Sequence, residues 1–191
     1  MQIDPQILEK CKKQDRRAQL ELYNTCYSLL LSICLRYEKN KEDAEALLNL
    51  GFLKIITNLE KYASHVPFEA WIRRIMMNAI IDEFRKNKKE KELMVSTDFE
   101  DQHYNRHVEL NSAQLQFEAE ELQLMIQKLP TVTQKVFNLH VLDGYSHKEV
   151  SEMLEMSTGT SKWHVNNARK LLKGMIEDHA EKEKQGSNKS E

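Results

Sequence analysis

A row of polar and basic side chains between residues 74 and 85 is the first feature of the sequence that could bind a ligand. One face of a helix would carry all of its members, which recur at i, i+4, i+8 and i+11: Arg74, Asn78, Asp82 and Arg85. Arginine and asparagine side chains contact phosphates and base edges, and the segment RKNKKEK at 85–91 adds four lysines. The row therefore indicates either a nucleic-acid surface or a salt-bridged face in solvent.

A second group of such side chains lies near the C-terminus, on a helix that we expect from about Thr158 to Met175. Small and apolar residues recur there at helical spacing and should face inward: Ser161, Val165, Ala168 and Leu172. Side chains that can contact phosphates and bases would face solvent or DNA: Thr158, Thr160, Lys162, Trp163, Asn166, Arg169, Lys170 and Lys173. The alternative is the solvated face of an ordinary helical bundle.

The residues before this helix predict a helix-turn-helix. Ser146 and Glu149 have the spacing of a capping box and begin a helix that ends near Leu154, before a short corner at 155–157. In a helix-turn-helix the second helix lies in the major groove of DNA. Upstream, an apolar helix ends at Pro130, and a second capping box begins the next helix: Thr131 and Gln134.

The N-terminal half carries three apolar repeats at helical spacing. The first, over about 16–37, consists of Leu20, Tyr23, Tyr27, Leu30, Leu31 and Cys34. Asn40, with Asp43 three residues later, should cap the second, which reaches Leu59. After a loop at 61–67 the third begins at Phe68. Three such faces are enough to close one small bundle.

The composition favours an all-α protein. Its 191 residues include five glycines and three prolines, too few turn-formers for a sandwich or barrel of many strands. Residues 96–121 contain seven acidic side chains against one arginine. We therefore predict two small helical domains, at 1–92 and 115–177, joined by an acidic linker at 93–114 and followed by a disordered tail at 178–191.

Several classes of function have no support in the sequence. The polar N-terminus and the lack of a long apolar run predict a cytoplasmic protein without membrane insertion. The three cysteines form no Cys-x-x-Cys pair and are expected to be small buried hydrophobes. His103 and His107 lie in the linker without a nearby cysteine, so we expect no metal site. Without a phosphate loop or a nucleophile elbow, we expect neither an enzyme nor a cofactor.

Two longer segments resemble bacterial sigma factors. The segment LPTVTQKVFNLHVLDGYSHKEVSEMLEMSTGTSKWHVNNARKLLK at 129–173 resembles region 4, and DAEALLNLGFLKIITNLEKY followed by FEAWIRRIMMNAIIDEFRKNKK resembles region 2. The resemblance covers about residues 18–175, in the order and overall length of the extracytoplasmic-function (ECF) group. The segments RRIMMNAIIDEFRKNKK and GTSK…ARKLL resemble members from Bacteroidota. The resemblance to sigma factors implies a protein that binds core RNA polymerase and directs promoter-specific initiation, with an anti-sigma factor as a possible partner.

The resemblance also implies a polymerase-binding face on the helix after Asn40. In the family the segment DAEDLxQExF contacts a coiled coil of the large polymerase subunit, while region 4 binds the flap. The matching residues here are Asp43, Glu45, Asn49 and Leu50. Because Ala46 and Leu50 replace polar family residues, binding is either weaker or apolar at Leu50, and Asp43 alternatively only caps its helix. A DNA-only regulator or a sequestering interaction protein therefore stays open.

The DNA contacts implied by the resemblance lie on both domains. The outward-facing residues from Thr158 to Lys170 would read the minus-thirty-five element, and Trp163 either contacts thymine methyls, packs on the preceding helix or binds a partner. Tyr62 either stacks on a flipped base, worth roughly 1–3 kcal/mol, or closes the bundle. Asp82 should orient Arg85, and Trp71 should pack in the core. The minus-ten element would be contacted by Tyr62, Arg74, Asn78, Arg85, Lys86 and Lys88.

Overall fold

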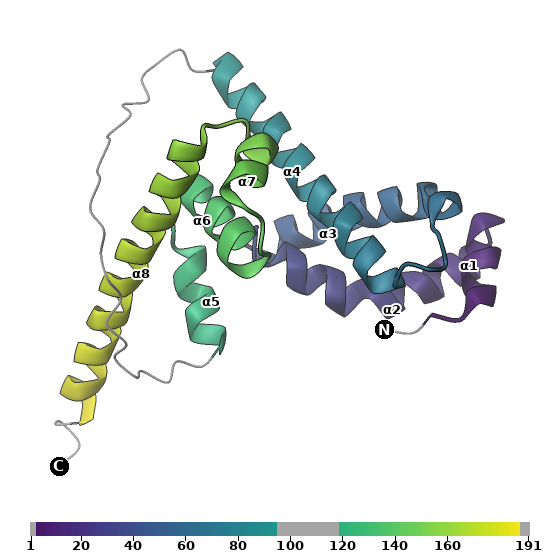
Figure 1. Cartoon of the computed structure of the whole chain (residues 1–191). Coiled ribbons are helices and arrows are strands. Elements are labelled where there is room, and N and C mark those ends of the chain that lie inside the picture. Colours follow the sequence, from purple (N-terminus) through teal and green to yellow (C-terminus); the bar gives the residue numbers. More distant parts are fainter. Residues whose placement is uncertain (1–2, 95–118, 188–191) are drawn as a thin grey trace. The chain divides into compact units, whose positions relative to one another are not determined.

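The computed structural model describes residues 3–94 and 119–187 (Figure 1). Within those residues every regular element is a helix, which confirms the all-α prediction. The chain divides into two compact units, residues 1–96 and 97–191. Residues 93 and 94 of the predicted linker belong to a helix, and the rest of it, with His103 and His107, lies outside the described residues.

Unit 1 contains the helices α1 (Pro5–Lys12), α2 (Arg16–Cys34), α3 (Lys41–Thr57) and α4 (Phe68–Met94), with a 3-10 turn at Leu59–Lys61. The predicted cap of α3 is confirmed, because the Asn40 side chain accepts a hydrogen bond from the Asp43 N–H at 2.8 Å. Helix α1 was not predicted. Its signal is the pair Asp4 and Pro5, the residue types that favour the N-cap and the first helical position.

The core of unit 1 lies where α2, α3 and α4 meet. Its fully buried side chains include Leu22, Leu30, Leu48, Ile55, Ile72 and Met76. The predicted face of α2 was partly wrong, because Leu20 is 61% exposed. Burial of an aliphatic side chain contributes about 1.5–3 kcal/mol, and α2 buries another apolar row instead. That row is Ala18, Leu22, Cys26, Leu30, Ile33 and Cys34.

Gly51 allows α3 and α4 to approach closely. A Cβ atom at this position would lie 2.5 Å from Met76 Sδ on α4. Cys34 Sγ lies 3.9 Å from the same sulfur, and all three cysteines are buried, as predicted. Burial raises the pKa of the Cys26 and Cys34 thiols to about 12. These thiols are therefore core groups rather than reactive ones.

Unit 2 contains α5 (Ala119–Gln127), α6 (Thr131–Phe137), a π-helical turn at Asn138–Leu142, α7 (His147–Leu154) and α8 (Thr158–Ser187). The capping box of Ser146 and Glu149 is confirmed in both directions. The one expected at Thr131 and Gln134 is wrong. Pro130 has the extended conformation of the N-cap, which makes Thr131 the first helical residue. The Gln134 side chain is completely buried instead of returning to the helix start.

Helix α8 continues beyond the expected end at Met175. Leu172, Met175 and Ile176 pack with residues of α5 and α6 in the core of unit 2. The Lys173 ammonium lies 3.8 Å from the Glu177 carboxylate one turn later. His179 Nε2 lies 3.8 Å from a carboxylate oxygen of Glu121 on α5. Residues 178–187, which we assigned to a disordered tail, are therefore helical, as their Ala, Glu, Lys and Gln content favours.

In the ranges 3–94 and 119–187, no helix has both the length and the apolar character needed to cross a membrane.

Candidate functional site

The α7–corner–α8 segment has the geometry of a helix-turn-helix. Helix α7 ends at Leu154, and its C-cap Glu155 has a left-handed backbone conformation (φ 53°) that turns the chain towards α8. The Met156 N–H then donates to the Ser151 carbonyl at 3.1 Å. Ser157 Oγ caps α8 by accepting from the Thr160 N–H at 3.0 Å. The predicted corner at 155–157 is therefore confirmed, and local hydrogen bonds fix where α8 begins.

The two faces of α8 are as predicted. Its inward residues are all buried: Ser161, Val165, Ala168 and Leu172. Its outward residues are exposed at Thr158, Lys162, Asn166, Arg169, Lys170 and Lys173. Thr160 and Trp163 are half-buried, the first at the cap and the second with its ring edge-on to His164, at 4.8 Å between centroids. The exposed face thus presents cations, an amide and a hydroxyl, the groups that contact phosphates and base edges.

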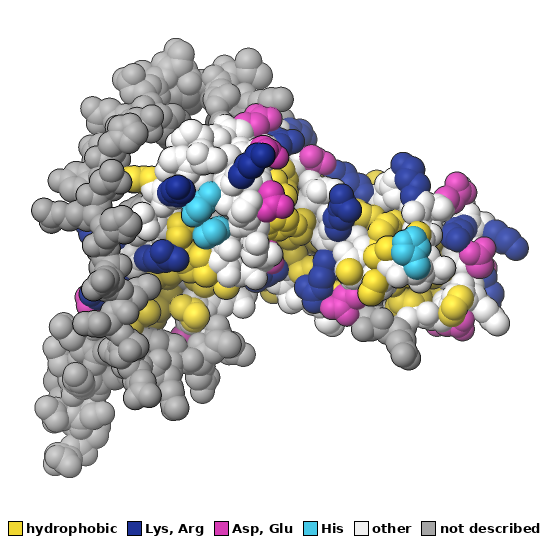
Figure 2. All heavy atoms as spheres, viewed as in Figure 1, with side chains coloured by type: hydrophobic (Ala, Val, Ile, Leu, Met, Phe, Trp, Pro, Cys, Tyr) yellow, Lys and Arg dark blue, Asp and Glu magenta, His cyan; other side chains and the backbone are white. Residues whose placement is uncertain are grey.

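Histidines that the sequence analysis did not identify connect α8 to its neighbours. The His140 and His147 rings stack at 3.9 Å between centroids, and His147 Nδ1 lies 3.0 Å from Ser161 Oγ on α8. His164 Nδ1 lies 3.0 Å from Thr133 Oγ1 on α6. Figure 2 shows histidine side chains beside lysines and arginines on this unit. The two residues of each hydrogen-bonded pair are 14 and 31 positions apart in the sequence, so no helical periodicity could have revealed these contacts.

The environments of His147 and His164 favour the neutral forms of these two side chains. Burial lowers the pKa of His164. Burial also lowers the pKa of His147, and the neighbouring His140, Lys162 and Arg169 lower it further. In the unfolded chain a histidine has a pKa of about 6.5. Around and below that pH the unfolded state therefore binds more protons than the folded state, in which the pKa is lower. The stability that neutral His164 provides is therefore complete above the unfolded pKa and is lost as pH falls through the lower folded pKa.

We expect unit 2 to unfold at a lower temperature at about pH 5.5 than at about pH 7.5. Each kcal/mol of unfolding free energy that is lost should lower the unfolding temperature by about 4–8 °C. The fluorescence of Trp163, in a Trp71→Phe background, would follow this unit in the full chain. His164→Gln should reduce the pH dependence, whereas His65→Gln, at an exposed position of unit 1, should leave it unchanged. Equal pH dependence in all variants would contradict the assignment to His164.

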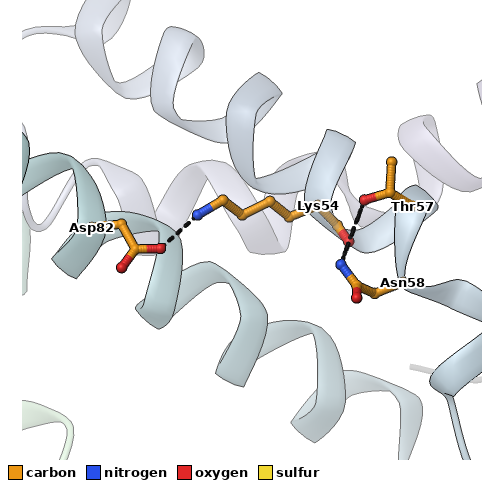
Figure 3. Close-up of polar contacts among 4 residues, drawn as sticks. All are labelled: Lys54, Thr57, Asn58 and Asp82. Carbon is orange, nitrogen blue, oxygen red and sulfur yellow. Dashed lines mark hydrogen bonds and ion pairs between the residues drawn. The ribbon is translucent and has the colours of Figure 1, made fainter.

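The row on α4 is exposed at Arg74, Asn78 and Asp82 and half-buried at Arg85. Asp82 does not take the expected role of orienting Arg85. Its Oδ2 lies 2.7 Å from Lys54 Nζ, which reaches across from α3 (Figure 3). The prediction failed because α3 approaches α4 at this level, a contact that the sequence of α4 alone cannot show. Lys86 is exposed, and the side chain of Lys88 lies outside the described residues.

Tyr62 lies in an aromatic cluster at the start of α4. Its ring is 5.2 Å from that of Phe68 and 5.1 Å from that of Trp71, between centroids. Its hydroxyl donates to the Val66 carbonyl at 2.8 Å. These contacts favour the alternative in which Tyr62 closes the bundle. Trp71 packs against the same rings but is half-buried, less deep than expected.

The outward face of α3 combines bonded polar groups with exposed apolar ones. Asn40 caps the helix by accepting from the Asp43 N–H, and its Nδ2 donates to the Asp43 carboxylate at 2.8 Å. The Asp43 side chain therefore holds the capping residue and does not itself cap the helix. The Tyr27 hydroxyl donates to Glu45 at 2.8 Å and the Tyr23 hydroxyl to Asn49 at 2.9 Å.

Beside them, Leu50 is 47% exposed, and one turn later Leu53, which we had not singled out, is 60% exposed. Ala46 is exposed on the same side. An exposed apolar row on one helix is typical of a surface that binds another protein.

Comparison with known proteins relates both units to one family. The model of sigma-70 region 2 matches residues 22–90, and that of sigma-70 region 4 matches residues 119–172. The ECF RNA polymerase sigma factor SigW of Bacillus subtilis is 25% identical over 178 residues, 90% of this chain and 95% of that protein. The sigma factor SigZ of the same organism is 30% identical over 146 residues, 74% and 78% of the two chains.

A solved structure, the sigma factor RpoE with the anti-sigma factor NepR from Bartonella quintana, aligns with a TM-score of 0.48 and 17% identity, over 82% of this chain and 95% of that one. The matched regions follow each other in the same order on two separate helical units. The chain therefore belongs to the sigma-70 family of RNA polymerase sigma factors, in its ECF group, and directs the initiation of transcription.

Proposed function

We propose that this sigma factor binds core polymerase through α3 and recognises promoters through two DNA surfaces, α4 at the minus-ten element and α8 at the minus-thirty-five element. One observation carries the proposal. Helix α8 buries its small residues on one side and exposes Lys162, Asn166 and Arg169 on the other, at the exit of a helix-turn-helix corner. This is the arrangement of a helix that enters a major groove.

At the minus-thirty-five element the side chains of α8 would divide into two roles. Lys162, Arg169 and Lys170 would bind phosphates. Each contact would add about 0.9 to the slope with which the logarithm of the binding constant falls against the logarithm of the salt concentration. Asn166 can hydrogen-bond an adenine edge. Thr158 stands free of the cap, whereas the Thr160 hydroxyl is 2.8 Å from that of Ser157 and would contact DNA only through its exposed part. Trp163, which is half-buried, would contact a thymine methyl or a partner with the exposed part of its ring.

At the minus-ten element, the exposed side chains of Arg74 and Asn78 would contact DNA, and Arg85, Lys86 and Lys88 would add phosphate contacts further along. Tyr62 would stack on a flipped base only by leaving part of its aromatic cluster. Melting would be carried out by this surface with the polymerase, which supplies all the chemistry of RNA synthesis.

On the polymerase side, α3 would meet the coiled coil of the large subunit with a mixed surface. Glu45 and Asn49 are oriented by tyrosines of α2, and Leu50 adds an apolar contact where the family has a polar residue. Asp43 is exposed and would contribute through its carboxylate, which also accepts from Asn40 Nδ2. The flap would bind unit 2.

The setting of the protein follows from this activity. We propose action in the cytoplasm, where core polymerase is found, without a cofactor. An anti-sigma factor is a further proposed partner. Exposed leucines occur on both units, among them Leu53 and Leu124, and an anti-sigma factor would cover them when the protein is not bound to polymerase. We also propose an origin in the phylum Bacteroidota, which the Bacteroidota-like segments around α4 and α8 support.

A second candidate is a DNA-binding regulator that has lost polymerase binding. Ala46 and Leu50, both exposed, and the hydrogen bond that ties the Asp43 carboxylate to Asn40 favour it. It would keep the surfaces of α4 and α8 and need no contact through α3.

Run-off transcription of fragmented genomic DNA from the source bacterium, with sigma-free core polymerase and the full chain, separates the two candidates. Discrete starts that share upstream elements are expected. If protein shown to be folded gives no starts but binds those fragments, the DNA-only regulator is supported and the proposed function is wrong.

A further inference from the structure

Asp82 is the one carboxylate in the row that α4 would present to promoter DNA. Its side chain is 57% exposed and stands between Asn78 and Arg85 in the helical order. A phosphate within about one Debye length, 8–10 Å in physiological salt, would be repelled by this charge if it were not compensated.

Lys54 supplies the compensating charge from another helix. Its Nζ atom lies 2.7 Å from Asp82 Oδ2 (Figure 3). The lysine stands in the last turn of α3, where its carbonyl accepts hydrogen bonds from Asn58 Nδ2 at 2.9 Å and from Thr57 Oγ1 at 3.2 Å. One turn earlier, the absence of a side chain at Gly51 leaves room for the Met76 thioether of α4. The two carbonyl hydrogen bonds involve the main chain of Lys54, from which the side chain extends to Asp82 on α4.

This ion pair is a poor candidate for a stabilising contact. Both side chains are substantially exposed, 43% for Lys54 and 57% for Asp82, and exposed pairs contribute little to folding free energy. Its effect on the local electric field does not depend on that contribution. As long as the ammonium stays near the carboxylate, the row on α4 presents only neutral or positive groups to an approaching strand.

We propose that Lys54 is a positioning residue of the minus-ten surface, which cancels the charge of Asp82 and directs that carboxylate towards α3 and away from DNA. The inference rests on the proposed function, in which α4 faces the promoter. Lys54 acts through Asp82 and makes no DNA contact of its own. A helix assigned to polymerase binding thereby tunes the DNA surface of its neighbour.

The test uses the full chain in complex with core polymerase and a promoter fragment recovered by run-off transcription. Permanganate reactivity of unpaired thymines measures opening, and thermal unfolding measures stability. The variants are Lys54→Gln, Asp82→Asn and the double variant. The control is Arg73→Gln, which breaks another exposed ion pair of α4, with Glu69 at 2.8 Å, on a side at least about 100° from the row.

We expect Lys54→Gln to reduce opening by about five- to tenfold, the order of the interaction between two unit charges about 4 Å apart in water. Asp82→Asn should open as well as the unaltered protein, and adding it to Lys54→Gln should restore opening. Arg73→Gln should have no effect, and unfolding temperatures should stay alike.

Four results would overturn the inference. A double variant as poor as Lys54→Gln would mean that the lysine contacts DNA itself. Equal losses for Lys54→Gln and Asp82→Asn, with lowered unfolding temperatures, would mean a structural pair. If the unaltered holoenzyme opens no promoter, the proposed function fails and the inference with it, whereas opening that is insensitive to Lys54→Gln removes only the inference.

Discussion

Charge reversal of Arg74 and Arg85 together should abolish promoter opening and leave the affinity for core polymerase unchanged. Arg74 is exposed on α4, and the structure shows no ion pair for it among the residues described. Arg85 lies three turns further along the same side of the helix. A hydrogen bond to a charged group contributes about 1.5–3 kcal/mol, so losing two phosphate contacts and adding two repulsive charges should cost at least about 100-fold in opening.

The measurement is permanganate reactivity of a promoter fragment, together with a polymerase-binding titration of the same variant. Arg73→Glu is the matched control, because it changes the neighbouring arginine on the side of α4 that carries Glu69. Normal opening by the Arg74→Glu, Arg85→Glu variant would remove α4 from the DNA surface. Loss of both opening and polymerase binding would instead indicate that the variant is misfolded.

The features that sequence predicted correctly depend on residues close together in the chain. The capping box at Ser146 and Glu149 spans three residues, and the faces of α8 follow from the helical period alone. The identity of the family could be predicted for the same reason. Regions 2 and 4 are defined by continuous segments, and both family models match within the expected range of 18–175.

The failures involve contacts between distant segments. Nothing in α2 alone tells that Ala18 and Leu22 turn inward and Leu20 outward, because both rows have helical spacing and the packing of α3 and α4 decides between them. Asp82 was assigned to Arg85, three residues away, but pairs with Lys54, 28 residues away. At Thr131 two local signals competed, and the fixed backbone of Pro130 determined the N-cap.

The same dependence on distant contacts bears on the least typical part of the site, the apolar row on α3. Tyr23 and Tyr27 satisfy Asn49 and Glu45 from α2, so these polar groups already have partners before any polymerase arrives. A polar group that is already hydrogen-bonded within the protein adds less binding free energy to a new interface than a polar group that is free to form a new hydrogen bond there. The binding energy would then come chiefly from apolar surface that is exposed in the free protein, at Leu50 and Leu53.

Leu50→Glu and Leu53→Glu should each weaken core polymerase binding by at least about tenfold. Roughly half of each side chain is exposed and available for burial, and a carboxylate placed there would have to be desolvated without a partner. Because both positions face solvent in the free protein, the thermal unfolding temperature should not change. Leu20→Glu is the control, since Leu20 is 61% exposed but lies on α2. Fluorescence anisotropy of the labelled full chain against core polymerase gives the dissociation constants. Unchanged binding by both α3 variants would show that polymerase does not contact this row, and would favour the regulator that binds DNA alone.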